Sequence, residues 1–340
     1  MATYFGRLMA VLGGIVVLSA GATESLPLDA PLPDSVPPGT VLRVGSSTDL
    51  SLKLAGVADN LPFKLEVANI TGGPGTINAF HAKALDIGTS QDIPAINAAW
   101  IGIDAKIVAI RLRQNEASTL YRFGISPKAH IDSLADLRGK RIAYSPGQAQ
   151  GALVLRTLAK YGIQKGEVDL VELPSTGRAY TDALAANLVD AAPIAGINVK
   201  RYEENYGKDG ARILQVAGIK DDPSILWVRA ETLKDPAKAA AIKAYVRAWA
   251  RAQYWIDTHR DQWIDAYYVQ DQGVSLEDAR YILNSQGSAD IPLTWNDAIA
   301  HEQQTIDFMA RETGHKSFDA ATLFDRRFET VAGAAYAQTP

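Results

Sequence analysis

Short polar turns that follow apolar, strand-like segments hold the residues of this chain that could do chemistry. Four such turns lie within Val41–Asp49, Ile70–Thr76, Gly88–Pro94 and Ala143–Gly151, and a helix-like segment follows each of them. A helix that begins at a turn directs its unpaired N–H groups and the positive end of its dipole toward that turn. Four converging turns would therefore bind an anion without a metal or a catalytic side chain.

The candidate ligand-binding residues are those whose hydroxyl, amide or backbone groups would face the space between the turns. They are Ser47, Thr48, Gly73, Pro74, Ser90, Gln91, Asp92, Gln148, Gln150, Thr176 and Trp227. Small hydroxyls and side-chain amides can hydrogen-bond an oxyanion, and glycines beside a proline let the backbone approach it closely.

Each candidate also has an ordinary structural role. Ser, Thr and Asp before a helix commonly act as caps worth about 1 kcal/mol, and a tryptophan in an apolar strand, such as Trp227, often only packs. The four turns together favour a site, because open α/β sheets bind ligands outside the carboxyl ends of their strands.

The charged groups near the turns do not decide the identity of the solute. No Lys or Arg lies in the turns themselves, so neutral dipoles would carry the recognition. Arg111, Arg113, Arg122 and Arg178 either reach the site or lie at the surface. Asp92 either caps its helix or accepts a hydrogen bond from an amine on the solute.

The common enzyme signatures are missing from the sequence. The five histidines, His81, His130, His259, His301 and His315, show no metal-ligand spacing, and there is no cysteine, no Gly-x-Ser-x-Gly and no phosphate loop with its lysine. We therefore expect no metal, no cofactor and no catalytic residue, and His81 is the one side chain on which an enzyme interpretation would depend.

Composition excludes several classes of protein. The chain has 340 residues, of which 47% are hydrophobic and 21% charged, which is typical of a globular protein with two domains. Its formal charge of −4 is not that of a nucleic-acid-binding protein.

The N-terminal 40 residues predict export. Arg7, the apolar run Leu8–Leu18 and the small residues after it form the three parts of a signal peptide over residues 1–22. The form is that of a lipoprotein signal, but Gly21 stands where the lipid-bearing cysteine would be. We therefore expect a periplasmic or extracellular protein without a lipid, and an extended, unpaired proline-rich linker over residues 23–40.

Strand-like and helix-like segments alternate along the rest of the chain, which predicts an α/β fold of mostly parallel sheets flanked by helices. The expected strands are Val41–Ser46, Lys64–Asn69, Leu85–Gly88, Ala105–Ile110, Arg141–Tyr144, Asp169–Glu172, Ala191–Ile194 and Ser224–Val228. Two alternating sets predict two lobes, residues 41–122 with 228–340 and residues 123–227, with crossings near Tyr121–Ile125 and Ile225–Val228. Amphipathic helices from Pro236 onward form a helical extension.

One segment carries a family resemblance. Residues 133–143, Ser-Leu-Ala-Asp-Leu-Arg-Gly-Lys-Arg-Ile-Ala, resemble a segment of type II periplasmic binding proteins. Thr71-Gly72-Gly73-Pro74, Leu85-Asp86-Ile87-Gly88 and Asp92-Ile93-Pro94 resemble the aliphatic sulfonate, taurine and nitrate branch of ABC-transporter binding proteins. The likeness covers about residues 41–230.

The resemblance implies a monomeric Venus-flytrap protein that binds a small anionic solute and passes it to an ABC-transporter permease. The same fold also has enzymes, desulfinases and thiamin-pyrimidine synthases among them, so an enzyme acting on a sulfur- or pyrimidine-containing molecule is the alternative. The desulfinase chemistry that resembles this branch needs a cysteine, which this chain lacks. A regulatory sensor domain is the third possibility, and the export signal disfavours it.

Overall fold

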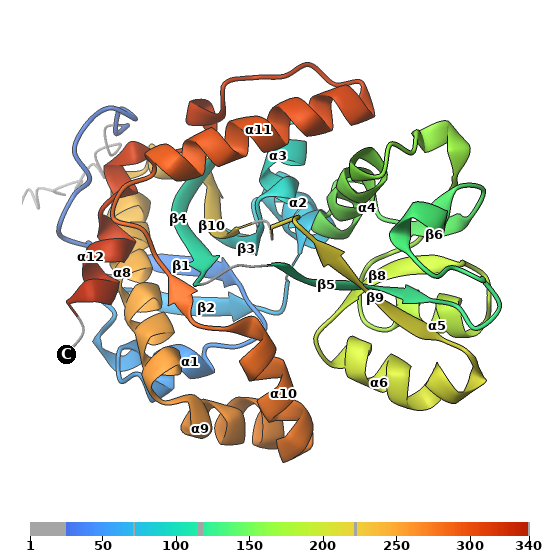
Figure 1. Ribbon diagram of the computed structural model, residues 1–340. Coiled ribbons are helices and arrows are strands. Elements are labelled where there is room, and N and C mark those ends of the chain that lie inside the picture. Colours follow the sequence, from blue (N-terminus) through green and yellow to red (C-terminus); the bar gives the residue numbers. More distant parts are fainter. Residues whose placement is uncertain (1–24, 71, 115–117, 221–222, 339–340) are drawn as a thin grey trace, which may run out of the picture.

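Two α/β lobes, each built around its own sheets, form the molecule (Figure 1). The structure is a computed structural model that describes residues 25–70, 72–114, 118–220 and 223–338. The signal peptide predicted over residues 1–22 lies outside the described residues.

Lobe one has two sheets that meet at a parallel bridge between Val44 and Ile87. The first sheet pairs β1 (Val41–Gly45) with β2 (Lys64–Ala68) in parallel. The second has the order β11 (Ala289–Asp290), β4 (Ala105–Arg113), β10 (Ser224–Arg229) and β3 (Gly88–Gln91). Ile107, Val108, Ala109 and Ile110 are at most 1% exposed, because helices cover both faces of this sheet.

The helices of lobe one surround these sheets. They are α1 (Leu50–Leu54), α2 (Gly73–His81), α3 (Ile93–Trp100), α7 (Ala230–Leu233), α8 (Pro236–Thr258), α9 (Arg260–Trp263), α10 (Leu276–Gln286), α11 (Asn296–Thr313) and α12 (Val331–Ala337). A π-helical segment, Ile264–Asp271, connects α9 toward α10. The amphipathic segments of the sequence after Pro236 are thus helices that brace lobe one.

Lobe two is a five-stranded sheet with helices on its faces. Its strand order is β7 (Asp169–Glu172), β6 (Arg141–Tyr144), β8 (Ala191–Ala195), β5 (Ser118–Ile125) and β9 (Arg212–Ala217). Its helices are α4 (Ala149–Lys160), α5 (Ala179–Ala185) and α6 (Ile197–Tyr206).

The predicted α/β class is confirmed, and the sheets are mixed rather than mostly parallel. β6 runs parallel to β7 and β8, whereas β5 is antiparallel to β8 and β9. In lobe one β10 is antiparallel to both β3 and β4. The antiparallel strands β5 and β10 are the first strands that the chain forms after it enters lobe two and after it returns to lobe one.

The chain passes from one lobe to the other a few residues earlier than the sequence predicts. All of β5 pairs within lobe two and all of β10 pairs within lobe one. Tyr121–Ile125 and Ile225–Val228 are therefore strands of one lobe each and not crossings. The crossings lie between β4 and β5 and between β9 and β10.

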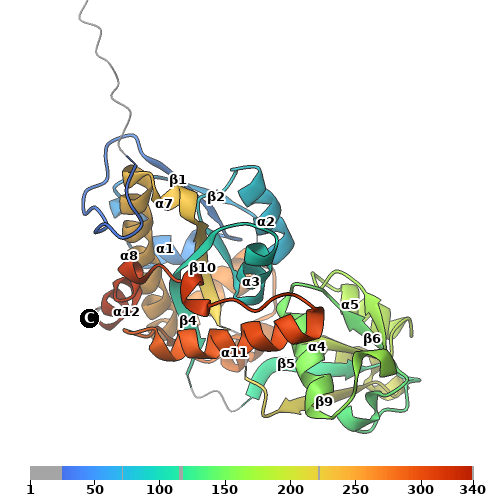
Figure 2. The ribbon, with the colours of Figure 1, turned by 90° about the horizontal axis from the view of Figure 1, so that it is seen from above.

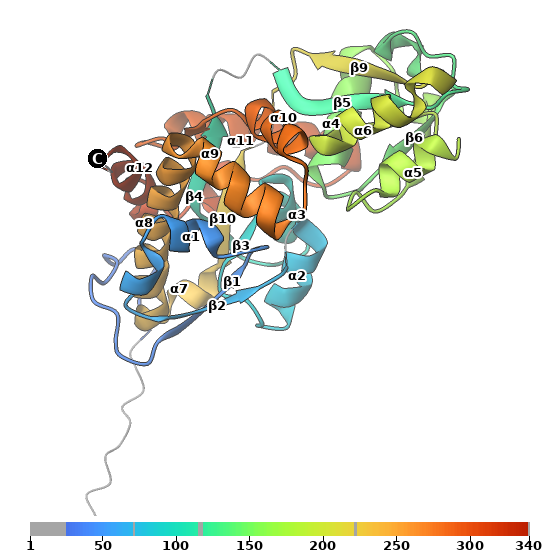
Figure 3. The same cartoon turned by 90° about the horizontal axis from the view of Figure 1, so that it is seen from below.

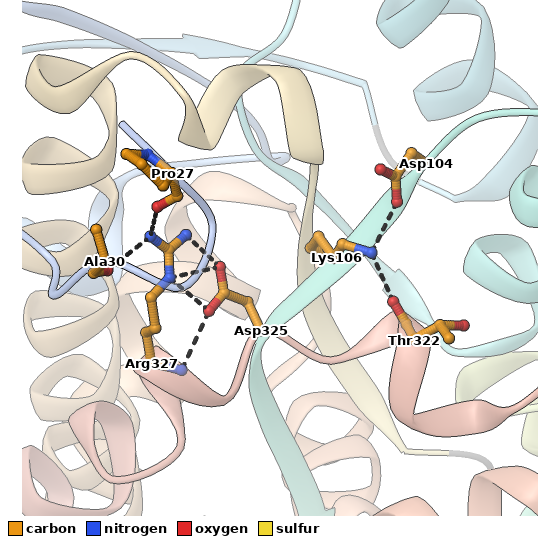
Figure 4. Close-up of polar contacts among 7 residues, drawn as sticks. All are labelled: Pro27, Ala30, Asp104, Lys106, Thr322, Asp325 and Arg327. Atoms are coloured by element: carbon orange, nitrogen blue, oxygen red, sulfur yellow. Dashed lines mark hydrogen bonds and ion pairs between the residues drawn. The ribbon is translucent and has the colours of Figure 1, made fainter. Parts of the chain in front are cut away.

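The proline-rich stretch is part of lobe one and not an unpaired tether. Leu32 is only 8% exposed, and the Leu26 N–H donates to the carbonyl of Lys234 at 2.7 Å. The Arg327 guanidinium donates to the carbonyls of Pro27 and Ala30 while it pairs with Asp325 (Figure 4). We refer to residues 25–36 as the N-terminal strap.

Candidate functional site

The turns after β1 and β2 lie against each other in lobe one. A Cβ on Gly45, the last residue of β1, would be 2.6 Å from the carbonyl oxygen of Ile70, so only glycine allows this approach. In the first turn, Thr48 Oγ1 accepts from the Leu50 N–H at 3.0 Å and the Ser46 hydroxyl donates to the Thr48 carbonyl. Thr48 thus binds the first N–H of α1, whose N-cap is Asp49, and Ser47 is exposed beside it.

Lobe two meets lobe one at the glycine-rich turn before α2. A Cβ on Gly73 would be 2.5 Å from Nε2 of Gln148 and 2.8 Å from Cβ of Pro94. A second close approach lies nearby, where a Cβ on Gly147 of lobe two would be 2.9 Å from Nδ2 of Asn97 in α3. The start of α4 in lobe two therefore faces the starts of α2 and α3 in lobe one, as Figure 1 shows for the three helices.

The turn before α4 is shaped by close backbone packing. Gly151, in the first turn of α4, has no room for a side chain, because a Cβ there would lie 2.1 Å from the carbonyl oxygen of Ser145. Gln148 precedes the helix and makes no side-chain capping hydrogen bond. Gln148 and Gln150 are both half-buried, and the amide of Gln148 lies beside Gly73 of lobe one.

The turn between β3 and α3 also contacts both lobes. Gln91 Oε1 accepts a hydrogen bond from the Tyr121 hydroxyl of β5 in lobe two at 3.1 Å. The Ser90 hydroxyl donates to the Gln91 carbonyl at 2.7 Å. Asp92 is buried, and its carboxylate accepts from the N–H of Ile93 at 2.7 Å, so it acts as a cap of α3.

Two candidates lie elsewhere. Trp227 is 0% exposed and packs edge-on against Phe80 with ring centroids 4.8 Å apart, so it belongs to the core of lobe one. Thr176 is exposed in the loop after β7; its carbonyl accepts from the Ala179 N–H, and the neighbouring Gly177 carbonyl accepts from Asn198 of α6. The structure thus gathers Gly73, Gln148 and Gln91 between the lobes, whereas the Trp227 side chain is buried within lobe one.

Side chains that the sequence reasoning missed complete these contacts. Tyr121 and Asn97 join the lobes, although Tyr121 was expected only as part of a crossing. Their sequence neighbours do not indicate that these two side chains contact the opposite lobe. Of the arginines that could reach the site, Arg122 donates to the carbonyls of Thr119 and Tyr121, and Arg178 is exposed and paired with Asp182.

A second set of contacts holds the lobes together away from the turns. Lys200 of α6 pairs with Asp278 and Glu277 at the start of α10, at 2.6 and 2.9 Å. Figure 3 shows the helices α6 and α10. On another side, Arg156 of α4 donates to the Thr305 hydroxyl of α11 at 2.9 Å (Figure 2). We call the Lys200–Asp278–Glu277 group the α6–α10 latch.

Replacing Lys200 by alanine is expected to loosen the two lobes. The side chains of Lys200 and Asp278 are only 18% and 15% exposed, and a hydrogen bond between charged groups is stronger than one between neutral groups. The hydrogen bond from Lys200 lowers the pKa of Asp278, so the latch is charged at neutral pH and is lost only when acid protonates this carboxylate below its ordinary pKa.

Small-angle X-ray scattering on the ligand-free protein measures this loosening as a larger radius of gyration. Lys53→Ala is the matched control, since Lys53 pairs with Asp49 within one lobe and is 60% exposed. An unchanged scattering profile for Lys200→Ala would show that the latch does not hold the lobes.

Across residues 25–338, apart from their undescribed gaps, no three His, Cys, Asp or Glu side chains come together in a way that could hold a metal ion. Within the same residues, none of the helices is both long and apolar enough to cross a membrane.

Two α/β lobes joined by two connecting segments, with helix-starting turns facing one another between the lobes, define the fold class of periplasmic solute-binding proteins. A family model described as NMT1/THI5 like matches residues 64–262, which is more than half of the chain. The chain belongs to the NMT1/THI5-like family.

Solved structures share the whole architecture. The alkanesulfonate-binding protein SsuA of Xanthomonas axonopodis pv. citri, bound to MOPS, superimposes with a TM-score of 0.70 at 23% identity, covering 87% of this chain and 99% of its own. The periplasmic aliphatic sulphonate-binding protein SsuA of Escherichia coli gives 0.66 at 21% identity, covering 83% and 91%. The desulfurization enzyme DSZB gives 0.61 at 16% identity, covering 87% and 99%. At these identities the likeness shows the fold.

A curated relative matches over a shorter stretch. It comes from Escherichia coli (strain K12), bears the name of an aliphatic sulfonates-binding protein, and is 26% identical over 117 residues. The match spans 34% of this chain and about a third, 36%, of the relative.

Proposed function

We propose that this chain is an extracytoplasmic solute-binding protein that delivers a small anionic solute, such as a sulfonate, taurine or nitrate, to an ABC importer. The observation that carries the proposal is the opposition of Gly73 and Gln148: helix starts from both lobes face each other where a solute would be enclosed. A solute that contacts both lobes shifts the balance between open and closed forms by its differential binding energy.

The names of the relatives support the class of solute. Both SsuA proteins and the curated relative carry names that refer to sulfonates. The proposed partners are the solute and the permease of an ABC transporter, and the proposed form is a monomer that is secreted by its N-terminal signal.

An enzyme on the same fold is the second candidate. The observation that favours it is the likeness to DSZB. Against it, the chain has no cysteine, and His81, on which an enzyme interpretation would depend, is exposed at the last residue of α2. Recovery of the solute after incubation with the protein separates the two candidates, because a carrier returns its solute unchanged and an enzyme consumes it.

The test uses the purified secreted protein with butanesulfonate, taurine and nitrate. We expect at least one of them to raise the melting temperature and to be recovered intact by mass spectrometry. Consumption of the solute would establish the enzyme, and the absence of any shift with all three would refute the proposed solute class.

The double variant Ser90→Ala, Gln148→Ala tests the turns themselves. Removing a hydroxyl from lobe one and a side-chain amide from lobe two should weaken binding by roughly tenfold or more, with each neutral hydrogen bond contributing about 1 kcal/mol. The variant should fold normally, since neither side chain belongs to the buried core. Unchanged affinity in isothermal titration would mean that other residues bind the solute.

A further inference from the structure

Arg111 lies at the carboxyl end of β4, at the same edge of the lobe-one sheet as the turn before α3. Ser224 of β10 pairs with Arg111 on one side and with Gln91 on the other. Residues that pair in this way share one face of a sheet, with about 4.8 Å between neighbouring strands. Arg111 is thus in one row with Gln91, whose side chain already reaches Tyr121 of lobe two.

The Arg111 guanidinium lies near the Asp257 carboxylate but forms no ion pair with it. Its Nε is buried and has no hydrogen-bond partner, and within the described part of the chain no ion pair reaches it. Burial lowers the pKa of Arg111, and the nearby Asp257 carboxylate only partly offsets this. Asp257 Oδ2 already accepts from the Ala289 N–H and the Tyr336 hydroxyl, both at 2.9 Å.

The other arginines near the sheets are differently placed. Arg141, at the amino end of β6, makes a double contact with Asp190 at 2.8 and 3.2 Å. Arg122 is held by two backbone carbonyls. A buried cation costs free energy unless it is paired. An anion that binds beside an unpaired guanidinium at a ligand-facing edge would offset this cost.

We propose that Arg111 pairs with the charge of the bound solute, which is then a monoanion with an oxyanion head group that can accept two parallel N–H hydrogen bonds. The planar guanidinium suits a sulfonate, carboxylate or nitrate for this reason. The inference rests on the proposed function and differs from the expectation that neutral dipoles alone recognise the anion. Gln148 and the turn before α2 would then hold the solute from the opposite side.

The test compares butanesulfonate with butyl methyl sulfone, a neutral probe of similar shape, by isothermal titration. The wild-type protein should prefer the sulfonate by roughly 10- to 100-fold, since hydrogen bonds to charged groups contribute about 1.5–3 kcal/mol. Arg111→Gln should lose this preference, and Arg111→Lys should keep part of it. Arg141→Gln, which breaks an ion pair at the other end of a strand, should keep the wild-type preference.

Thermal unfolding of the ligand-free proteins separates a binding role from a bracing role. Arg111→Gln should unfold at the same temperature as the wild type or higher, because the variant removes an unpaired cation. A lower melting temperature with unchanged affinity would show that Arg111 only braces α8 and α12. That result, or equal binding of sulfonate and sulfone by the wild type, overturns the inference while the proposed function stands.

Binding of no anion at all by the wild type would overturn both proposals. If Arg111→Gln does not fold, the preference for sulfonate over sulfone is compared between the wild type and Arg111→Lys, and this comparison still tests whether Arg111 pairs with the solute.

Discussion

Replacing Trp227 by alanine is expected to lower the free energy of unfolding by about 3–5 kcal/mol, the usual cost of removing a large aromatic side chain from a core. Trp227 is fully buried between α2 and β3, where it packs against Phe80. A Cβ on the neighbouring Gly88 would lie 3.1 Å from its indole nitrogen, which shows how closely the site is filled. Urea unfolding followed by circular dichroism measures the loss.

The conservative variant Trp227→Phe serves as the control and should lose much less stability, since most of the ring volume remains. Solute affinity, measured at low temperature where the alanine variant is still folded, should stay within a few fold of the wild type. A large loss of affinity with unchanged stability would instead make Trp227 a ligand-binding residue, as the sequence allowed.

Asp325→Ala is expected to destabilise the protein by a similar amount, about 3–5 kcal/mol, because it leaves a buried cation unpaired. Arg327 and Asp325 are 11% and 5% exposed, and the guanidinium meets the carboxylate at 2.5 and 2.8 Å. The same guanidinium holds the N-terminal strap (Figure 4). The unfolding free energy and the rate of proteolysis within residues 25–36 both report the change.

Asp104→Ala is the matched control, since Asp104 also pairs with a cation, Lys106, but is 66% exposed. An exposed pair contributes less than about 1 kcal/mol. Equal stability losses for the two variants would contradict the role assigned to burial, and so would an intact strap in Asp325→Ala.

Local signals explain why many elements could be predicted from the sequence. α8 begins at Pro236, where the Asp235 carboxylate accepts from the N–H groups of Ala237 and Lys238, and α10 begins after Ser275, whose hydroxyl accepts from the Asp278 N–H. Proline in the first turn and a Ser or Asp cap are visible in the sequence. The helices span Pro236–Thr258 and Leu276–Gln286, and the first of them begins at Pro236 as predicted.

Elements that depend on distant partners could not be placed in this way. The third strand was expected at Leu85–Gly88, where apolar residues alternate, but the ladder with β10 puts it at Gly88–Gln91. β9, Arg212–Ala217, was not predicted because it pairs only with β5 and half of its residues are polar or exposed.

The candidate site likewise combines features that the local sequence indicates with features that depend on distant partners. The turn at Gly73 and the residues around Gln148 were found from the glycine and strand pattern, whereas their mutual approach across the lobes is a tertiary feature. Arg111 was seen as one of four arginines that could reach the site. Only the register of β4, β10 and β3 puts it in line with Gln91.

The N-terminal strap also bears on how this protein should be produced. A recombinant version that starts at Val41, where the first strand begins, would leave Arg327 without the carbonyls of Pro27 and Ala30 and would remove the buried side chain of Leu32. Expression boundaries and affinity tags therefore belong upstream of Leu26.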